Sequence, residues 1–228
     1  MRRSSVESLH SRIVGCKKCP RLIEYCKGVA REKRRQFQDE SYWGKPVPGF
    51  GDPDAGLLIV GLAPAAHGGN RTGRMFTGDN SGLWLYRALF RAGFSSHSQS
   101  VGRDDGLMLR GAYITAGIHC APPANRPLPE ELLACSDYLR EEILLMTHAR
   151  VYLVLGQIAL KALWSVLPAA VKPRKALPGF GHGHEITLLD GRLILMSYHP
   201  SQQNTFTRKL TEPMFDAVFS RSREFLKT

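Results

Sequence analysis

Gly56-Leu57-Leu58-Ile59-Val60-Gly61 is a short, continuous apolar run that begins and ends with glycine. Such a run is typical of a strand that is covered on both faces, as strands in parallel sheets are. Three later runs have the same character and occupy residues 112–116, 151–155 and 193–197. Because helical patterns separate these runs, the sequence predicts an α/β sandwich with a mainly parallel sheet.

Helical patterns fill the segments around the predicted strands. Ser81 can cap a helix that runs through Phe90. Pro129 and the two glutamates after it can open another, because proline and acidic residues are favoured in a first helical turn. Further helices are expected at residues 158–167 and 209–225.

The N-terminal part of the chain is also helical in pattern. Apolar residues recur at helical spacing over residues 5–35, with an interruption at Pro20. We expect residues 1–228 to form one domain. In it, residues 1–48 are a basic helical extension and residues 49–228 are the α/β core.

The composition excludes several classes of protein. At 43% hydrophobic, the chain of 228 residues is too apolar to be disordered. No apolar run approaches the ~20 residues that span a bilayer, and the N-terminus has no apolar signal-peptide core. Five cysteines are an odd number, which argues against a secreted disulfide framework. We expect an intracellular, cytoplasmic protein that does not enter a membrane.

The charge is positive and uneven. The net charge is +11, and residues 1–48 hold 12 Lys and Arg against 5 Asp and Glu. A basic surface can keep a protein soluble, or it can neutralise the phosphates of a nucleic acid and release their counterions. Charge alone leaves both explanations open.

Three polar loops each follow a predicted strand, at residues 61–80, 117–127 and 198–207. The carboxyl ends of parallel strands lie at one edge of a sheet, and ligands bind in the crevice beyond it. The three loops therefore predict the position of an active cleft.

Four of the cysteines suggest a metal centre. Cys16 and Cys19 form a CxxC turn, Cys120 follows a strand, and Cys135 lies on the inward face of the helix expected from Pro129. Four thiolates of this kind can hold a zinc ion or an iron–sulfur cluster, and spacing does not separate the two. The alternative is that Cys120 and Cys135 are small core residues and that the CxxC pair is exposed or redox-active. Cys26 is left over.

The loop after the first strand is rich in glycine and in groups that carry chemistry. Glycines let a backbone approach a ligand closely, but the phosphate-loop pattern GxxxxGK[ST] is absent. A proton carrier, two cations, a flat aromatic face and a carboxylate together suit an aromatic, phosphate-linked substrate. The loop offers all of these groups in His67, Arg71, Arg74, Phe76 and Asp79. An ordinary mobile loop is the alternative.

His199 directly follows the last predicted strand and precedes a proline and a polar loop. A histidine there can donate a hydrogen bond to an oxyanion, or act as an acid or base. A structural role is the alternative. His182 and His184 look like a metal pair, but no third ligand lies near them in the sequence, and we give them no role.

Two of these loops also carry a family resemblance. Residues 61–79 resemble the first motif of the type 5 uracil-DNA glycosylases, and residues 199–205 resemble that family's second motif. Further similar segments lie at residues 47–52 and 120–125. The similarity follows the family's order over nearly the whole chain.

The resemblance implies a fold, a cofactor and an activity. The implied fold is a three-layer α/β/α sandwich with a central, mainly parallel four-stranded sheet. The implied cofactor is a [4Fe-4S] cluster, with the basic extension packed on it and with four ligands: Cys16, Cys19, Cys120 and Cys135. The implied activity is removal of uracil and other deaminated or modified bases from damaged DNA in base excision repair, which leaves an abasic site.

The sequence departs from the wider superfamily at two places. Other members carry a polar side chain at the equivalent of Leu62-Ala63 and an asparagine that reads uracil at the equivalent of Ala116, whereas both places are apolar here. The resemblance therefore implies that Asp79 activates water. The asparagine that would reject other bases by hydrogen bonding is replaced by Ala116. We therefore expect the protein to accept several kinds of damaged base as substrates.

The resemblance also suggests roles for individual side chains. In the expected mechanism the base leaves the stack, His199 stabilises the departing base anion, and Asp79 orients water toward the sugar. Asn125 and Asn204 would hold the water, the sugar or a phosphate. The expected base pocket is lined by Gly61, Ala63, Ala65, His67 and Phe76, and the expected DNA contacts are Arg71, Arg74, Ser201 and Gln202.

No lysine occupies a motif position suited to a Schiff base, so we expect a monofunctional glycosylase without lyase activity. We also expect the protein to be a monomer and to pass abasic DNA to downstream repair proteins. Two other functions stay open. One is a nucleotide-handling hydrolase or transferase, and the other is a non-catalytic, cluster-bearing DNA-binding module.

Overall fold

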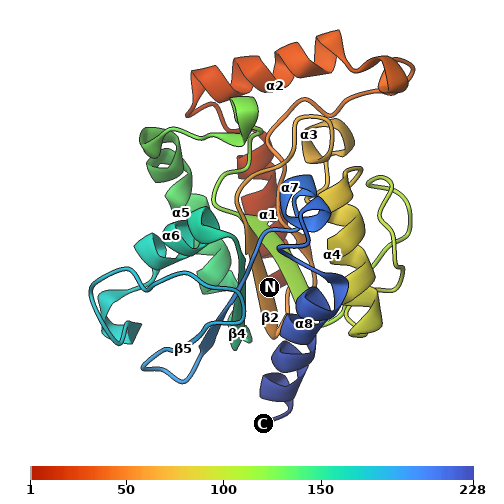
Figure 1. The fold of residues 1–228 in the computed structure, drawn as a ribbon. Helices are drawn as coiled ribbons and strands as arrows, with labels where there is room; N and C mark the ends of the chain where they lie inside the picture. Colours follow the sequence, from red (N-terminus) through yellow and green to blue (C-terminus); the bar gives the residue numbers. More distant parts are fainter. Residues whose placement is uncertain (1) are drawn as a thin grey trace.

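The computed structural model describes residues 2–228, with side chains from Ser4 onward. One six-stranded sheet runs through it in the order β1-β3-β2-β4-β6-β5 (Figure 1). The four inner strands are parallel, and both edge strands are antiparallel to their neighbours. The strands are β1 (Phe50–Gly51), β2 (Leu57–Gly61), β3 (Ala112–Ala116), β4 (Val151–Leu155), β5 (Glu185–Thr187) and β6 (Leu193–Ser197).

The predicted α/β/α sandwich with a mainly parallel sheet is confirmed, but the expected number of four strands was wrong. The four predicted strands are the inner ones, and every residue in them is buried. The two additional strands are only two and three residues long and lie at the edges. Strands that short contain too little hydrophobic alternation to be visible in the sequence.

Side chains alternate between the two faces of the sheet and form one apolar core on each. Leu57 and Ile59 of β2 belong to the core that includes residues of α4 and α8, whereas Leu58 and Val60 belong to the core that includes residues of α5 and α6. The helices are α1 (Arg2–Val14), α2 (Pro20–Glu32), α3 (Gly69–Thr72), α4 (Asn80–Arg91), α5 (Pro129–Leu145), α6 (Gln157–Val166), α7 (Gln202–Phe206) and α8 (Glu212–Lys227). Short 3-10 turns are η1 (Arg35–Phe37), η2 (Pro123–Asn125) and η3 (Ala169–Val171).

Two helix starts differ from expectation. The side chain of Asp79, not that of Ser81, caps α4, and it accepts a hydrogen bond from the backbone N–H of Gly82. The last helix begins at Glu212 rather than at residue 209, because Thr211 caps it through the N–H of Met214. A cap needs an extended backbone before the helix, and Asp79 has this conformation.

The N-terminal helices lie against the core at two places. Leu9 and Ile13 of α1 pack with Tyr138 of α5, and Leu22 and Cys26 of α2 belong to a second small apolar group. Figure 1 shows α2 lying across the end of the molecule, above α3 and η2. No helix within residues 2–228 is long and apolar enough to cross a membrane.

Candidate active site and cysteine cavity

The three polar loops predicted from the sequence lie at one edge of the sheet. Residues 62–80 follow β2, residues 117–128 follow β3, and residues 198–207 follow β6, and all three strands run in the same direction. Two of these loops contain short helices, α3 and α7, which the sequence pattern did not predict. Figure 1 shows both helices near the same end of the central strands.

Phe76 and His199 come from different loops and meet above the sheet. Their ring centroids are 5.9 Å apart and the ring planes are inclined by 31°. The strand β4 lies between β2 and β6, so the two loops start about 10 Å apart and must reach across the end of β4. The residue there is Gly156, whose φ of +98° strongly favours glycine and which has no side chain to separate the two rings.

The ring of Phe76 lies directly against the backbone of β2. A Cβ atom added to Gly61 would be 2.8 Å from two atoms of the ring, so only glycine leaves room for the aromatic side chain. Phe76 itself has a φ of +53°, an uncommon conformation for a residue with a side chain. Tyr86 stabilises the preceding residue by donating a hydrogen bond of 3.0 Å to the carbonyl of Met75.

Asp79 is a partly buried carboxylate at the N-terminus of α4. Its Oδ1 accepts a 2.7 Å hydrogen bond from the N–H of Gly82. Its Oδ2 lies where a side chain at position 68 would be, because a Cβ on Gly68 would be 2.5 Å away. Burial raises the pKa of Asp79 above 3.8, although backbone donors and the charge of Arg71 act in the opposite direction. The carboxylate thus caps a helix through one oxygen and faces the glycine loop with the other.

His199 is held as a neutral imidazole. Burial lowers its pKa to about 4, so the ring is uncharged near pH 7. Asn204 donates a 2.8 Å hydrogen bond from Nδ2 to the backbone carbonyl of His199. Ser201 caps α7 by accepting from the N–H of Asn204. The structure therefore gives Asn204 and Ser201 a role in positioning His199.

The two arginines expected to contact DNA are buried in the protein. Arg71 and Arg74 are 7% and 4% exposed. Arg71 forms an ion pair with Glu40 and donates a 3.0 Å hydrogen bond to the carbonyl of Gly78. These positions differ from the expectation of a DNA contact, because both guanidinium groups bind partners within the chain.

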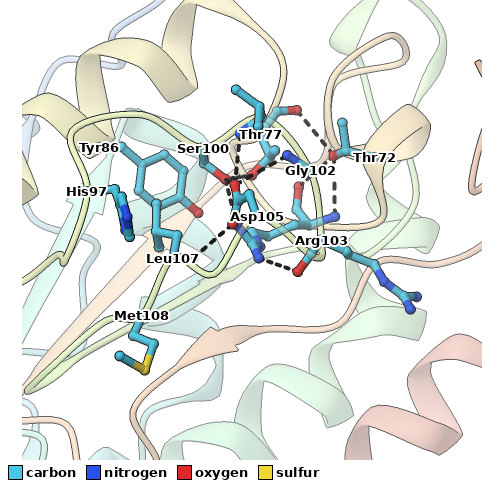
Figure 2. Close-up of polar contacts among 12 residues, drawn as sticks. Thr72, Thr77, Tyr86, His97, Ser100, Gly102, Arg103, Asp105, Leu107 and Met108 are labelled. Atoms are coloured by element: carbon cyan, nitrogen blue, oxygen red, sulfur yellow. Dashed lines mark hydrogen bonds and ion pairs between the residues drawn. The ribbon is translucent and has the colours of Figure 1, made fainter.

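Arg74 connects the glycine loop to residues 100–105. Figure 2 shows Ser100, Arg103 and Asp105 of this segment beside Thr72 and Thr77 of the loop. Its Nη1 lies 2.6 Å from Oδ1 of Asp105 and 2.8 Å from Oγ of Ser100. Ser100 also forms a 2.8 Å hydrogen bond with Thr77, next to Phe76. Burial alone would raise the pKa of Asp105, but Arg74 and three backbone N–H groups lower it to about 2. This buried ion pair supports the segment that carries Phe76.

The remaining predicted site residues are spread around the cleft edge. His67 accepts or donates a 3.0 Å hydrogen bond at Nδ1 with the hydroxyl of Tyr42. Ala63 packs against the apolar group that contains Cys120, and Ala65 is half-buried in the glycine loop. Gln202 is exposed on the first turn of α7.

Asn125 is the predicted catalytic residue with the least support. It is exposed in η2 with a φ of +55°. Within the described residues, no hydrogen bond or ring contact joins its side chain to Asp79 or His199. Its part in the reaction stays a prediction.

The four cysteines expected to bind a metal line one cavity. Cys16 and Cys19 lie between α1 and α2, Cys120 follows β3, and Cys135 is on α5, so three separate parts of the chain supply the thiols. Much of the remaining lining is apolar and includes Leu22, Ile23 and Ile118. Burial raises the pKa of Cys135 to about 12 in the metal-free chain. Within the described chain, no three Cys, His, Asp or Glu side chains converge on the position of a single metal ion.

Cys26 lies beside Cys120. Its thiol is fully buried and donates a 3.6 Å hydrogen bond to the carbonyl of Ala121. It also interacts with the thiol of Cys120, and the two residues belong to the same apolar group. Cys26 does not line the cavity formed by the other four cysteines, so it is a buried thiol next to one of the four predicted ligands.

The sequence did not indicate Tyr42, Asp105 or Gly156. Gly156 had a usable signal, because a glycine directly after a buried strand often marks a close approach of the backbone to another group. Tyr42 and Asp105 had none, since their partners lie far away in the sequence.

Comparison with known proteins identifies the family. The family model described as the uracil DNA glycosylase superfamily matches residues 48–223. The chain therefore belongs to the uracil DNA glycosylase superfamily.

Within that superfamily, the chain is more similar to type-5 than to type-4 uracil-DNA glycosylases. A type-5 uracil-DNA glycosylase of Thermus thermophilus is 48% identical over 95% of this chain and 96% of its own length. A type-5 enzyme of Pyrobaculum aerophilum is 45% identical over 93% and 89%. A type-4 uracil-DNA glycosylase of the same organism is only 32% identical over 86% and 83%. Within the superfamily the chain is a member of the type 5 group.

Proposed function

We propose that this protein is a monofunctional DNA glycosylase that hydrolyses the N-glycosidic bond of uracil in DNA. The observation that supports this most directly is the contact between Phe76 and His199 at the carboxyl edge of the sheet. An aromatic face beside a neutral imidazole suits a planar base that becomes an anion as it leaves. The activity named in the type-5 relatives is of this kind.

The first step is extrusion of the target base. A base within a duplex is out of reach of the cleft, and unstacking it costs a few kcal/mol, least for mispaired bases. The Phe76 ring, set against the bare backbone of Gly61, provides a stacking surface for the extruded base. Because Arg74 and Asp105 fix the segment next to Phe76, the ring, which is 7% exposed, is held in place before DNA binds.

The second step is cleavage of the bond. Negative charge develops on the base and positive charge on the sugar. His199 is neutral near pH 7 and can donate a hydrogen bond to the base oxygen that gains charge. Asn204 holds the backbone of His199, so the donor is oriented in advance.

Water then adds to the sugar. Asp79 faces the glycine loop with Oδ2, and an ionised carboxylate there can orient a water molecule and offset the positive charge on the sugar. Burial raises its pKa, whereas hydrogen bonds from the backbone N–H groups of Gly82 and Ser81 and the charge of Arg71 act in the opposite direction and favour the ionised form. The absence of a polar side chain at Leu62-Ala63 leaves this duty to Asp79.

We further propose that Cys16, Cys19, Cys120 and Cys135 hold a [4Fe-4S] cluster. Four thiols around one largely apolar cavity fit the ligand set of such a cluster. When bound, the cluster would supply a covalent link between the helical extension and the core. Base hydrolysis moves no electrons, so no catalytic step needs it. We propose that residues 1–48 are an extension of the same domain as the α/β core of residues 49–228.

The test is a base-release assay on duplexes that carry uracil, hypoxanthine, xanthine or an etheno base, with a thymine duplex as the control. We expect free base and an abasic site from uracil, and from several of the other lesions because the edge-reading asparagine is replaced by Ala116. Activity on free nucleotides alone would favour a nucleotide hydrolase. DNA binding without release of any base would favour a non-catalytic module. We propose that the protein acts on DNA as a monomer and leaves the abasic site to other repair proteins.

A further inference from the structure

The segment that links α2 to the core lies beside the glycine loop. Arg71 of that loop forms an ion pair with Glu40, and its guanidinium lies 3.8 Å from the centre of the Phe37 ring. Figure 1 shows the end of α2 and the following turn above α3. The position of η1 next to the candidate base pocket is therefore fixed by a buried arginine.

Tyr42 fixes the same segment to His67. The two side chains share a 3.0 Å hydrogen bond, and their rings meet edge to face with centroids 6.0 Å apart. The backbone N–H of Arg34 donates to the Tyr42 hydroxyl at 3.4 Å. Burial lowers the pKa of His67, and the charges of Arg34 and Arg71 lower it further, so Arg34 lies near this imidazole.

The arginines of this segment differ from several other arginines of the protein, which have acidic partners. Arg12, Arg91 and Arg221 each form an ion pair with a carboxylate. Arg34 and Arg35 are also exposed, yet neither guanidinium forms a hydrogen bond or an ion pair within the part of the chain that the structure describes. Two strong positive charges thus lie beside the candidate pocket without an acidic partner in the chain.

We propose that Arg34 and Arg35 form a phosphate-binding surface for the DNA strand next to the extruded nucleotide. This inference rests on the proposed function, because it requires a base from DNA in the adjacent pocket. Arginine forks bind phosphate oxygens well, and contacts of this kind set the position of the DNA without reading its sequence. The surface explains why part of the positive charge of residues 1–48 lies at this position, which the core alone does not require.

The test measures binding separately from catalysis. A labelled duplex with a stable abasic-site analogue is titrated with wild-type protein and with the Arg34→Gln/Arg35→Gln variant over a range of NaCl concentrations. A plot of log K against log salt has a negative slope, and each lost phosphate contact reduces its magnitude by about 0.9. For the double variant we therefore expect a slope that is less steep by roughly 2, and weaker binding at low salt. Both side chains are exposed, so the variant should fold.

Arg110→Gln is the matched control. Arg110 is also exposed but precedes β3, at the opposite edge of the sheet from the cleft, so its slope should equal that of the wild type. If the Arg34→Gln/Arg35→Gln variant has the same slope as the wild type, the proposal that these arginines bind DNA phosphates is wrong. Because no bond is cleaved in this titration, that result leaves the proposed activity untouched. Failure of the wild type to release uracil would instead contradict the proposed function.

Discussion

The imidazole of His199 lies with its centroid 5.9 Å from that of the Phe76 ring, although the two residues follow different strands. The contact spans the end of β4, where Gly156 has no side chain. It combines a stacking surface with a neutral hydrogen-bond donor in a single site.

Replacing His199 tests the donor. We expect His199→Ala to lower the rate of uracil release by about 10²–10³-fold, because one preorganised donor to a developing anion is lost. Single-turnover kinetics with saturating duplex give this rate directly. His148→Ala is the control, since His148 is exposed just before β4 at the far edge of the sheet. Equal rates for His199→Ala and the wild type would remove His199 from the chemistry.

Asp79→Asn separates the two roles of Asp79. Asparagine caps helices about as well as aspartate, so α4 and the thermal stability should be retained. The charge is lost, and we expect the barrier to uracil hydrolysis to rise by about 2–4 kcal/mol. The comparison needs a melting temperature and a single-turnover rate from the same preparation. A stable variant with the wild-type rate would assign water activation elsewhere.

The pH dependence of kcat/KM follows from the same two groups. Burial raises the pKa of Asp79 above 3.8, so the ionised, active form is lost as the pH falls through this raised value. His199 has a pKa of about 4 and stays neutral through the physiological range. We expect an acidic limb that is absent from Asp79→Asn, and no limb from His199 near pH 6.5. A limb centred near 6.5 that disappears in His199→Ala would contradict the neutral histidine.

The cysteines can be tested by iron content. Cys135 lines the cavity, whereas Cys26 donates to a backbone carbonyl. After anaerobic purification we expect about four iron atoms per wild-type chain, the ligand number and type being those of a [4Fe-4S] cluster. Cys26→Ser should retain the iron and Cys135→Ser should lose it. Iron-free wild-type protein, or equal iron in both variants, would count against the proposed ligands.

Much of this fold was predictable because its central strands are buried on both faces. Continuous apolar runs at residues 57–61 and 193–197 stand out from the helical patterns around them. The edge strands β1 and β5 were not recognisable in the sequence, because two or three residues are too few to show the alternation of apolar and polar side chains. The positions of the loops followed from the parallel sheet alone.

The site itself was only partly predictable. Sequence places Phe76, Asp79 and His199 after the right strands, but it does not reveal the partners of a charged side chain. Arg74 was expected on DNA because its charge was visible, whereas its ion pair with Asp105 forms only in the folded chain. The same holds for Asn204, which was expected on substrate and whose hydrogen bond to the backbone of His199 forms only in the folded chain.

The most direct measurement is a crystal structure of the protein with a duplex that carries a hydrolysis-resistant uracil nucleotide. The account predicts that the uracil ring lies outside the duplex, in contact with the Phe76 ring, with a base oxygen within hydrogen-bond distance of His199. A uracil that remains stacked in the duplex, or that occupies another part of the surface, would contradict it.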